Sequence, residues 1–223
     1  MRRPGYRIAA IFCLLILLTT TPVLAEGLLA GIDLGRSVGL GGRLAGTFEN
    51  FTRDLPLSAR FSVGYHAGDA GDPLAARRVF INNNTNGTPE ESAHSWQFRF
   101  DLVLPLTEIG PQTVFLFGGP RHARYTANYN YVGGNENFDV KTNPWGFGVG
   151  LESFFAVGAR SDFVLRLGLD RYAASELSGH DTRYAPDGID VNPREDYDYD
   201  SADDAVDQPK LEWLAAVGLR FRL

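Results

Sequence analysis

The 223-residue chain is 44% apolar, 12% aromatic and 22% charged, and its formal net charge is −6 at neutral pH. These fractions are close to those of ordinary globular proteins, which excludes a wholly disordered, collagenous or coiled-coil chain. The acidic balance argues against nucleic acid as a partner.

The first segment, residues 1–25, predicts a secretory signal peptide that is cleaved before Glu26. A basic start precedes an apolar run over residues 8–18 that is too short to span a membrane, and small residues at 23 and 25 suit the cleavage site. The only cysteine, Cys13, lies in this segment, so the mature chain of residues 26–223 contains no thiol. Cleavage removes three arginines and no acid, which takes the net charge to −9.

After the signal peptide, apolar and polar residues alternate, which is typical of β-strands with two chemically different faces. The clearest example is the segment 96–104, where every even position is a large apolar residue and Gln97, Arg99 and Asp101 occupy odd positions. Eight segments are predicted as strands: 28–38, 43–51, 57–66, 96–104, 114–126, 145–154, 163–172 and 211–223.

The connections between these strands alternate in length. Short links are predicted at 52–56, 105–113 and 155–162. Long links are predicted at 67–95, 127–144 and 173–210, while the first hairpin, 39–42, is tight. An up-and-down meander with short turns at one end and long loops at the other is typical of transmembrane β-barrels.

The strands also predict which face lies inside the barrel. One face carries the bulky apolar residues, which would overfill an eight-stranded barrel but would suit its lipid-facing wall. The other face carries glycines, expected inside at Gly31, Gly35, Gly64, Gly118, Gly146, Gly148, Gly150, Gly168 and Gly218. The same face carries the charged residues Asp33, Glu49, Arg60, Arg99, Asp101, Glu152, Arg166, Asp170, Glu212 and Arg220.

Strands of about 9 to 11 residues are long enough to span a bilayer when tilted. In lipid an open sheet edge would leave backbone groups without hydrogen-bond partners, so the first and last strands are expected to pair. The predicted fold is therefore all-β: an eight-stranded antiparallel up-and-down transmembrane β-barrel.

This combination of signal peptide, eight alternating strands and a chain that stops in its last strand resembles the small OmpA/OmpX-type outer-membrane barrels over residues 26–223. The segment 217–223 resembles the C-terminal signal that the bacterial barrel-assembly machinery reads, with Gly218, Phe221 and Leu223 as its matching positions, although such signals usually end in Phe. The resemblance implies the outer membrane of a Gram-negative bacterium, with outer-membrane lipid and lipopolysaccharide around the barrel. It does not imply a particular function.

Two interpretations of the inward charges remain open. Because buried charges without partners are costly, the mixture of acids and bases predicts a paired network that plugs the barrel. This favours a non-enzymatic structural or surface-interaction protein that displays mobile loops to an unknown external partner. The alternative is a narrow channel for small solutes, for which Gly146, Gly148 and Gly150 would thin one wall of the lumen.

A further alternative is an enzyme that modifies lipid A, with His66 or His180 as the base. Acyl transfer needs a nucleophile, a base and an orienting carboxylate within reach of one another. His94 adjoins Ser95, but adjacent residues of a strand face opposite sides. The sequence therefore predicts no catalytic residue.

The last long link is strongly acidic, with eleven acids and two arginines between residues 174 and 209. Within it, residues 196–207 resemble a twelve-residue calcium loop, although position six is Ser201 instead of Gly. The candidate Ca²⁺ ligands are Asp196, Asp198, Asp200, Asp204 and Asp207. The competing interpretation is an extended, solvated acidic loop, and no other cofactor is expected.

The first long link contains Arg77 and Arg78, which could contact lipopolysaccharide phosphates. Its polar, glycine-containing composition favours a mobile external loop instead.

Overall fold

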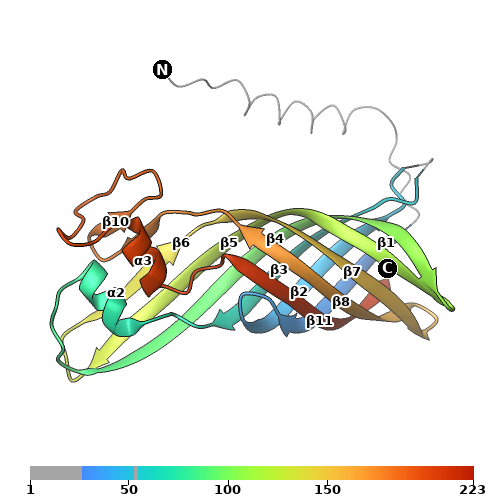
Figure 1. The fold of residues 1–223 in the computed structure, drawn as a ribbon. Coiled ribbons are helices and arrows are strands. Elements are labelled where there is room, and N and C mark those ends of the chain that lie inside the picture. Colours follow the sequence, from blue (N-terminus) through green and yellow to red (C-terminus); the bar gives the residue numbers. More distant parts are fainter. Residues whose placement is uncertain (1–26, 53–54) are drawn as a thin grey trace, which may run out of the picture.

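The computed structural model describes residues 27–52 and 55–223 (Figure 1). The predicted signal peptide, residues 1–25, lies outside the described residues. No helix in the described part of the chain is long and apolar enough to cross a membrane.

Eight strands form a closed antiparallel barrel, as predicted. They are β1 (Gly27–Arg36), β2 (Leu40–Glu49), β3 (Ser58–Gly68), β4 (Thr88–Ile109), β5 (Gln112–Val132), β7 (Trp145–Gly158), β8 (Ser161–Tyr172) and β11 (Leu211–Arg222). Each strand pairs with its neighbours in the chain order, and β1 pairs with β11 to close the ring. Closure satisfies the backbone groups that an open edge would leave unpaired in lipid.

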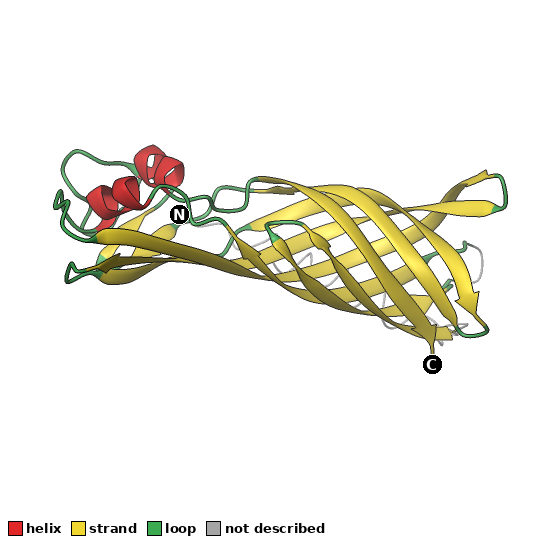
Figure 2. Cartoon of the chain, turned by 90° about the horizontal axis from the view of Figure 1, so that it is seen from below, coloured by secondary structure: helices red, strands yellow, loops and turns green. Residues whose placement is uncertain are grey.

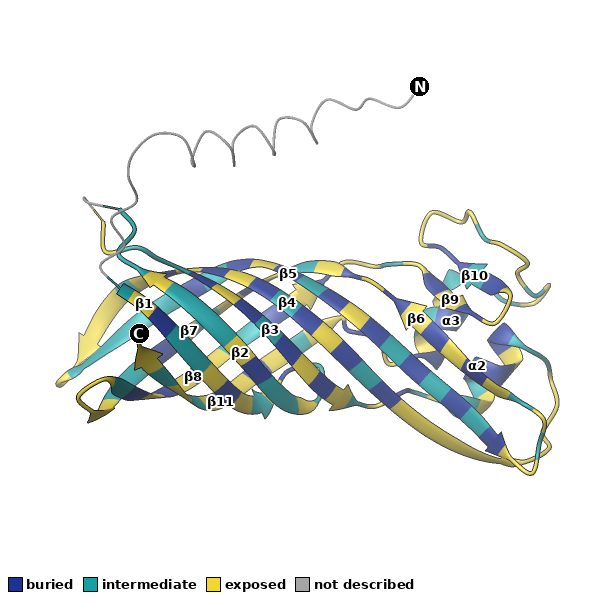
Figure 3. Cartoon of the chain, turned by 180° about the vertical axis from the view of Figure 1, so that it is seen from behind, coloured by how far each residue is buried: buried dark blue, intermediate teal, exposed yellow. Residues whose placement is uncertain are grey.

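The alternation predicted from the sequence appears as alternating burial along the strands (Figure 3). On β4, Gln97, Arg99 and Asp101 are buried inside the barrel, whereas Trp96 and Phe100 are exposed on its outer wall. The exposed apolar wall includes Ile32, Leu34, Leu44, Phe48, Phe61, Tyr65, Leu102, Leu104, Trp145, Phe147, Val149, Leu151, Leu165, Leu167, Trp213, Val217, Leu219 and Phe221. In a bilayer this wall contacts acyl chains.

The long connections differ from the expected mobile loops because much of them is folded. Strands β4 and β5 continue beyond the barrel, and the sheet is extended there by β6 (Asn137–Thr142), β9 (Leu177–Gly179) and β10 (Thr182–Tyr184). Two short helices, α2 (Pro73–Phe80) and α3 (Tyr199–Ala205), lie at the same end of the molecule (Figures 1 and 2). We call these five elements, with the ends of β4 and β5, the external cap.

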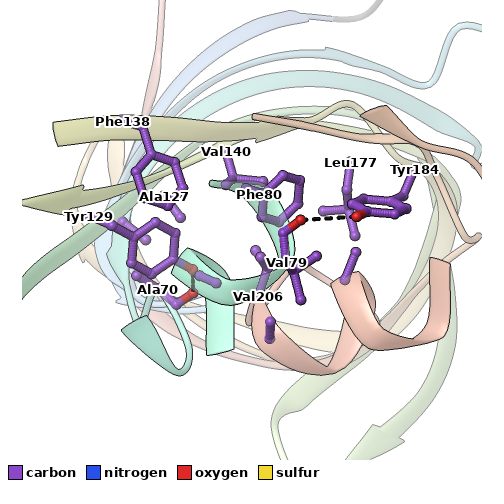
Figure 4. Packing of buried hydrophobic residues seen from close by; sticks show 14 of the residues in the cluster. Ala70, Val79, Phe80, Ala127, Tyr129, Phe138, Val140, Leu177, Tyr184 and Val206 are labelled. Atoms are coloured by element: carbon purple, nitrogen blue, oxygen red, sulfur yellow. Dashed lines mark hydrogen bonds between the residues drawn. The ribbon is translucent and has the colours of Figure 1, made fainter. Parts of the chain in front are cut away.

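The external cap has its own apolar core (Figure 4). Phe80 of α2 packs edge-on against Tyr184, with 5.6 Å between ring centroids, and also contacts Phe138. The Tyr184 hydroxyl donates a hydrogen bond of 2.9 Å to the Val79 carbonyl, and the Tyr129 hydroxyl donates to the Ala70 carbonyl. Buried aromatic rings with satisfied hydroxyls stabilise this arrangement and hold the connections in place.

The faces of β5 exchange their chemical character where the strand leaves the barrel. Its inward face carries Arg121 within the barrel and Tyr129 within the cap. Its outward face becomes polar in the cap, where Asn128 donates hydrogen bonds to Asn137 and Asp139. An apolar outer face suits lipid and a polar one suits water, so this exchange marks the external border of the membrane.

Local sequence explains why the two helices begin where they do. The Asp72 carboxylate caps α2 by accepting hydrogen bonds from the backbone nitrogens of Leu74 and Ala75, and Pro73 follows at the first helical position. The Asp198 carboxylate caps α3 in the same way. Backbone hydrogen bonds from Asp72 to Ala205 and from Asp207 to Ala70 then join the two helical segments.

Replacing Phe80 by Ala tests whether the cap is a packed unit. Phe80 is 2% exposed, and truncating a buried Phe costs about 3–5 kcal/mol. We expect limited proteolysis to cut the Phe80→Ala variant rapidly within residues 173–210, while its heat-modifiable gel migration, which reports the barrel, stays unchanged. Leu74→Ala on the exposed side of α2 is the matched control. Equal cleavage of wild type and Phe80→Ala would show that the cap is not held by its core.

Candidate functional site in the barrel lumen

The charged side chains inside the barrel form one continuous chain of ion pairs. Five arginines and four acids alternate along it, and each acid contacts two arginines. The order of the chain is Arg43, Asp33, Arg166, Glu152, Arg60, Asp101, Arg121, Asp170 and Arg99. We call these nine residues the lumen chain.

The contacts of the lumen chain are short and fully buried. The Arg60 Nη1 to Glu152 Oε2 distance is 2.6 Å, and Arg121 Nη2 lies 2.6 Å from Asp101 Oδ1. Asp170 accepts two hydrogen bonds from Arg99 and a third from Arg121. All nine side chains belong to residues that are at most 6% exposed. Buried ions are tolerated only when such pairs and hydrogen bonds satisfy them.

Seven of the eight barrel strands contribute to the lumen chain, so it links the whole circumference. The exception is β11, which supplies Gly218 instead. A Cβ atom at this position would collide with Asp33 Oδ1. Four of the eight ion pairs join neighbouring strands, and the other four reach past at least one intervening strand. The lumen chain therefore runs both along the wall and across the lumen.

The ten predicted inward charges lie in three places. Seven of the ten are members of the lumen chain: Asp33, Arg60, Arg99, Asp101, Glu152, Arg166 and Asp170. Arg220 and Glu49 lie 3.7 Å apart at the short-turn end, where Arg220 also contacts Asp162 at 2.7 Å. Glu212 faces inward nearer the cap and makes no ion pair within the described part of the chain.

Two members of the lumen chain, Arg43 and Arg121, were missing from the sequence prediction. The prediction placed Gly118 inside, whereas Gly119 faces the lumen and Gly118 faces outward. A shift of one residue turns every side chain of a strand to the other face, so the same error placed Arg121 on the outer face. Arg43 was the first residue of its predicted strand, but β2 begins at Leu40 and places Arg43 well inside.

Two of the β7 glycines that the channel alternative invokes have close neighbours in the lumen. A Cβ atom on Gly148 would collide with Asp170 Oδ1 and lie 2.6 Å from Arg121 Nε. A Cβ atom on Gly150 would collide with the ring of Phe117. The space next to these glycines is therefore filled by the lumen chain and one aromatic ring.

A cavity of about 390 Å³ enters the lumen from the short-turn end. Glu49 and Arg220 lie among its lining residues, together with Arg60, Glu152 and Arg166 of the lumen chain. The cavity therefore extends from the residues at the short-turn end to the ion pairs of the lumen chain.

The histidines proposed as bases for lipid A chemistry lie in different parts of the molecule. His66 is buried in the lumen, 4% exposed. His180 lies in the turn between β9 and β10 and forms an exposed ion pair of 3.5 Å with Asp181. His94 stacks on Tyr65 on the outer wall while Ser95 is buried inside, as adjacent strand residues require.

The segment of the predicted calcium loop is partly helical in the structure. Residues 199–205 are helical, and the Asp198 carboxylate is used to cap that helix. A helical backbone here differs from the extended loop in which a twelve-residue calcium site gathers its ligands around one ion. Within residues 27–52 and 55–223, no three His, Cys, Asp or Glu side chains are placed to hold a metal ion. Binding of Ca²⁺ by the candidate ligands stays a prediction for Asp196, Asp198, Asp200, Asp204 and Asp207.

Arg77 is not available to lipopolysaccharide phosphates, because its guanidinium group is buried within the cap. It pairs with Glu136, donates a hydrogen bond of 2.7 Å to the Asn86 carbonyl and lies 4.1 Å from the centre of the Tyr131 ring. Arg78, one residue further along α2, is exposed.

The residues of the predicted assembly signal lie at the short-turn end of the last strand. Gly218 faces the lumen and Phe221 faces outward on β11, while Leu223 follows the strand and donates its backbone N–H to Leu28. Recognition by the assembly machinery stays a prediction.

Comparisons with known proteins support the fold. The structure is similar to that of a major outer membrane protein from Thermus thermophilus, with a TM-score of 0.71 and 20% identity over 88% of this chain and 98% of that one. It is also similar to Neisserial surface protein A (NspA), with a TM-score of 0.43 and 12% identity over 88% and 96% of the two chains. No family model and no curated protein match the sequence.

The chain therefore has the fold of a small outer-membrane β-barrel. Its eight strands close into a ring, its outer wall is apolar, and its long connections gather at one end. A closed barrel of this kind is the β-structure that can span a membrane.

Replacing Arg99 or its neighbour Phe100 by Leu compares how much the lumen chain and the outer wall each contribute to the stability of the barrel. Arg99 is 1% exposed and donates two hydrogen bonds to Asp170, and removing one partner of a buried pair costs about 3–5 kcal/mol. We expect a clearly lower unfolding temperature for Arg99→Leu in detergent, and little change for its neighbour Phe100→Leu, which faces lipid. Equal effects of the two changes would mean that the faces are inverted.

A hollow of about 450 Å³ in the cap is lined by acids, and two of these acids have raised pKa values. Burial and the nearby Asp69 and Asp72 raise the pKa of Glu91, and burial together with Asp69 raises the pKa of Asp207. The full set of charged residues lining the hollow is Asp69, Asp72, Glu91, Asp203, Asp204, Asp207 and Lys210.

A raised pKa means that the folded cap binds protons more tightly than the unfolded cap does. The resulting stabilisation is complete below the ordinary carboxyl pKa and is lost as the pH rises through the raised value. We expect hydrogen exchange of cap amides, corrected for intrinsic rates, to be slower at pH of about 4 than at about 7. Glu91→Gln should reduce this difference, whereas Glu195→Gln, outside the hollow, should leave it unchanged. A wild-type cap that exchanges more slowly at the higher pH would contradict the prediction.

Proposed function

We propose that this protein is a non-enzymatic surface protein of the outer membrane, whose plugged barrel holds a folded external cap for contact with an external partner. The observation that supports this most is the lumen chain, which links seven strands across the interior through buried ion pairs. A pathway for solutes would have to separate these pairs, and each unpaired buried charge would cost several kcal/mol.

The cap supplies the surface for such a partner. Its outward face carries Asn128, Asn137 and Asp139, which are polar and close to one another. Ile189 and Val191 are exposed beyond β10, at 65% and 42%. A folded surface of this kind costs less conformational entropy on binding than a mobile loop would.

The runner-up is a narrow channel for small solutes. The cavity at the short-turn end favours it, because Arg60, Glu152 and Arg166 of the lumen chain line that cavity. In this reading the lumen chain would act as a gate.

Catalysis on lipid A is the weakest of the three functions. His66 lies within the lumen, and His180 is exposed on the cap next to an acid rather than a nucleophile. Acyl transfer needs a base hydrogen-bonded to its nucleophile. Lipid A mass spectra that changed between deletion and overexpressing strains would reopen this alternative.

Planar-bilayer conductance separates the plugged barrel from the channel. We expect the purified wild-type protein to carry no steady current. The double variant Arg60→Ala with Glu152→Ala should open a current, because it removes two adjacent members of the lumen chain while Asp101 and Arg166 keep their other partners. Glu49→Ala at the short-turn end is the control. Robust conduction by the wild type would contradict the plugged barrel.

A further inference from the structure

The outer wall of the barrel has a groove at its external border. The groove holds about 360 Å³ and lies over β4, β5 and the start of β7. We call it the border groove, and its lining residues that face outward are Phe61, Phe98, Phe100, Pro120, His122, Arg124 and Trp145.

Ring contacts define the floor of the border groove. The His122 ring stacks on Trp145, with 4.5 Å between centroids, and on Phe98 at 6.0 Å. The Arg124 guanidinium carbon lies 5.7 Å from the centre of the Phe98 ring. One cation therefore lies directly beside a row of aromatic rings, where a cation–π contact orients it.

The groove crosses the level at which the outer wall changes from apolar to polar. On β5 the outward residues run from Pro120 through His122 and Arg124 to Asn128, which belongs to the polar face of the cap. The apolar end of the groove thus faces acyl chains, and its charged end faces the headgroup layer of the external leaflet.

Arg124 has no acidic partner within the described residues, although ion pairs elsewhere in the protein use most of its arginines. Arg171, on the outward face of β8 opposite Phe147, has none either. Arg124 and Arg171 are thus outward-facing cations without an ion pair in the described residues, on a protein of net negative charge. Their charge complements an anionic headgroup.

We propose that the border groove binds lipid A, the phosphorylated and acylated anchor of lipopolysaccharide, from the external leaflet. A phosphate accepts hydrogen bonds from the Arg124 guanidinium group, and an acyl chain lies along Phe98, Phe100 and Trp145. The groove faces sideways into the membrane below the cap, so its occupant is a lipid rather than a soluble partner. Charge-assisted hydrogen bonds between arginine and phosphate supply the selectivity.

The test measures binding of diphosphoryl lipid A to the full-length mature barrel in phosphatidylcholine nanodiscs, by native mass spectrometry. Losing a hydrogen-bonded charge contact weakens binding by about tenfold. We expect that loss for Arg124→Glu, and near-normal binding for Arg124→Lys, which keeps the charge. Arg78→Glu, an equally exposed arginine on α2, should bind as the wild type does. Arg124→Ala replaces the Glu variant if the latter lacks heat-modifiable migration.

Ligand variants identify the source of the phosphate. Dephosphorylated lipid A should bind the wild type as weakly as diphosphoryl lipid A binds Arg124→Glu. Unchanged affinity of Arg124→Glu, or an equal loss in Arg78→Glu, would overturn the site. Phosphatidylglycerol that binds as tightly as lipid A would overturn the assignment of the occupant.

Discussion

Burying nine charged side chains inside an eight-stranded barrel is the constraint on which the rest of this structure depends. The barrel can hold them because every carboxylate of the lumen chain contacts two guanidinium groups. Glycines next to two of these carboxylates leave room for them. Gly148 is paired with Asp170 and Gly218 with Asp33, and a Cβ atom at either glycine would collide with the carboxylate of its partner. The apolar outer wall completes the arrangement, since a polar interior leaves only the exterior for lipid contact.

In the external cap, the same sheet faces water, whereas its outer face on the barrel wall faces lipid. Strands β4 and β5 cross the membrane border without a break, and their two faces exchange roles there. Below the border the interior is ionic and the exterior apolar, whereas above it Tyr129 and its neighbours form an apolar core under a polar exterior. One continuous sheet thus holds the cap in a fixed relation to the barrel, and both proposed contacts, with lipid and with an external partner, lie close to this border.

The sequence was informative wherever alternation was strict. Segment 96–104 placed Arg99 and Asp101 correctly because every second residue there is large and apolar. On β5, residues 114–117 are apolar on both faces, so alternation did not define which residues face inward. The prediction therefore omitted Arg121 from the inward charges. The cap could not be predicted because Phe80, Phe138 and Tyr184 are far apart in the chain and meet only through tertiary packing. The acidic spacing at 196–207 did not reveal helix α3, because an aspartate such as Asp198 suits a helix cap as well as an ion.

The backbone hydrogen bonds that join Asp72 to Ala205 and Asp207 to Ala70 have a consequence for the order of assembly. They connect a segment that follows β3 to one that precedes β11, so they form only when these two distant segments meet at the same end of the barrel. Until then, the aromatic residues of the cap have no α3 to pack against. The cap therefore cannot be completed by local folding of any one connection, because it needs the first and the last long connection together.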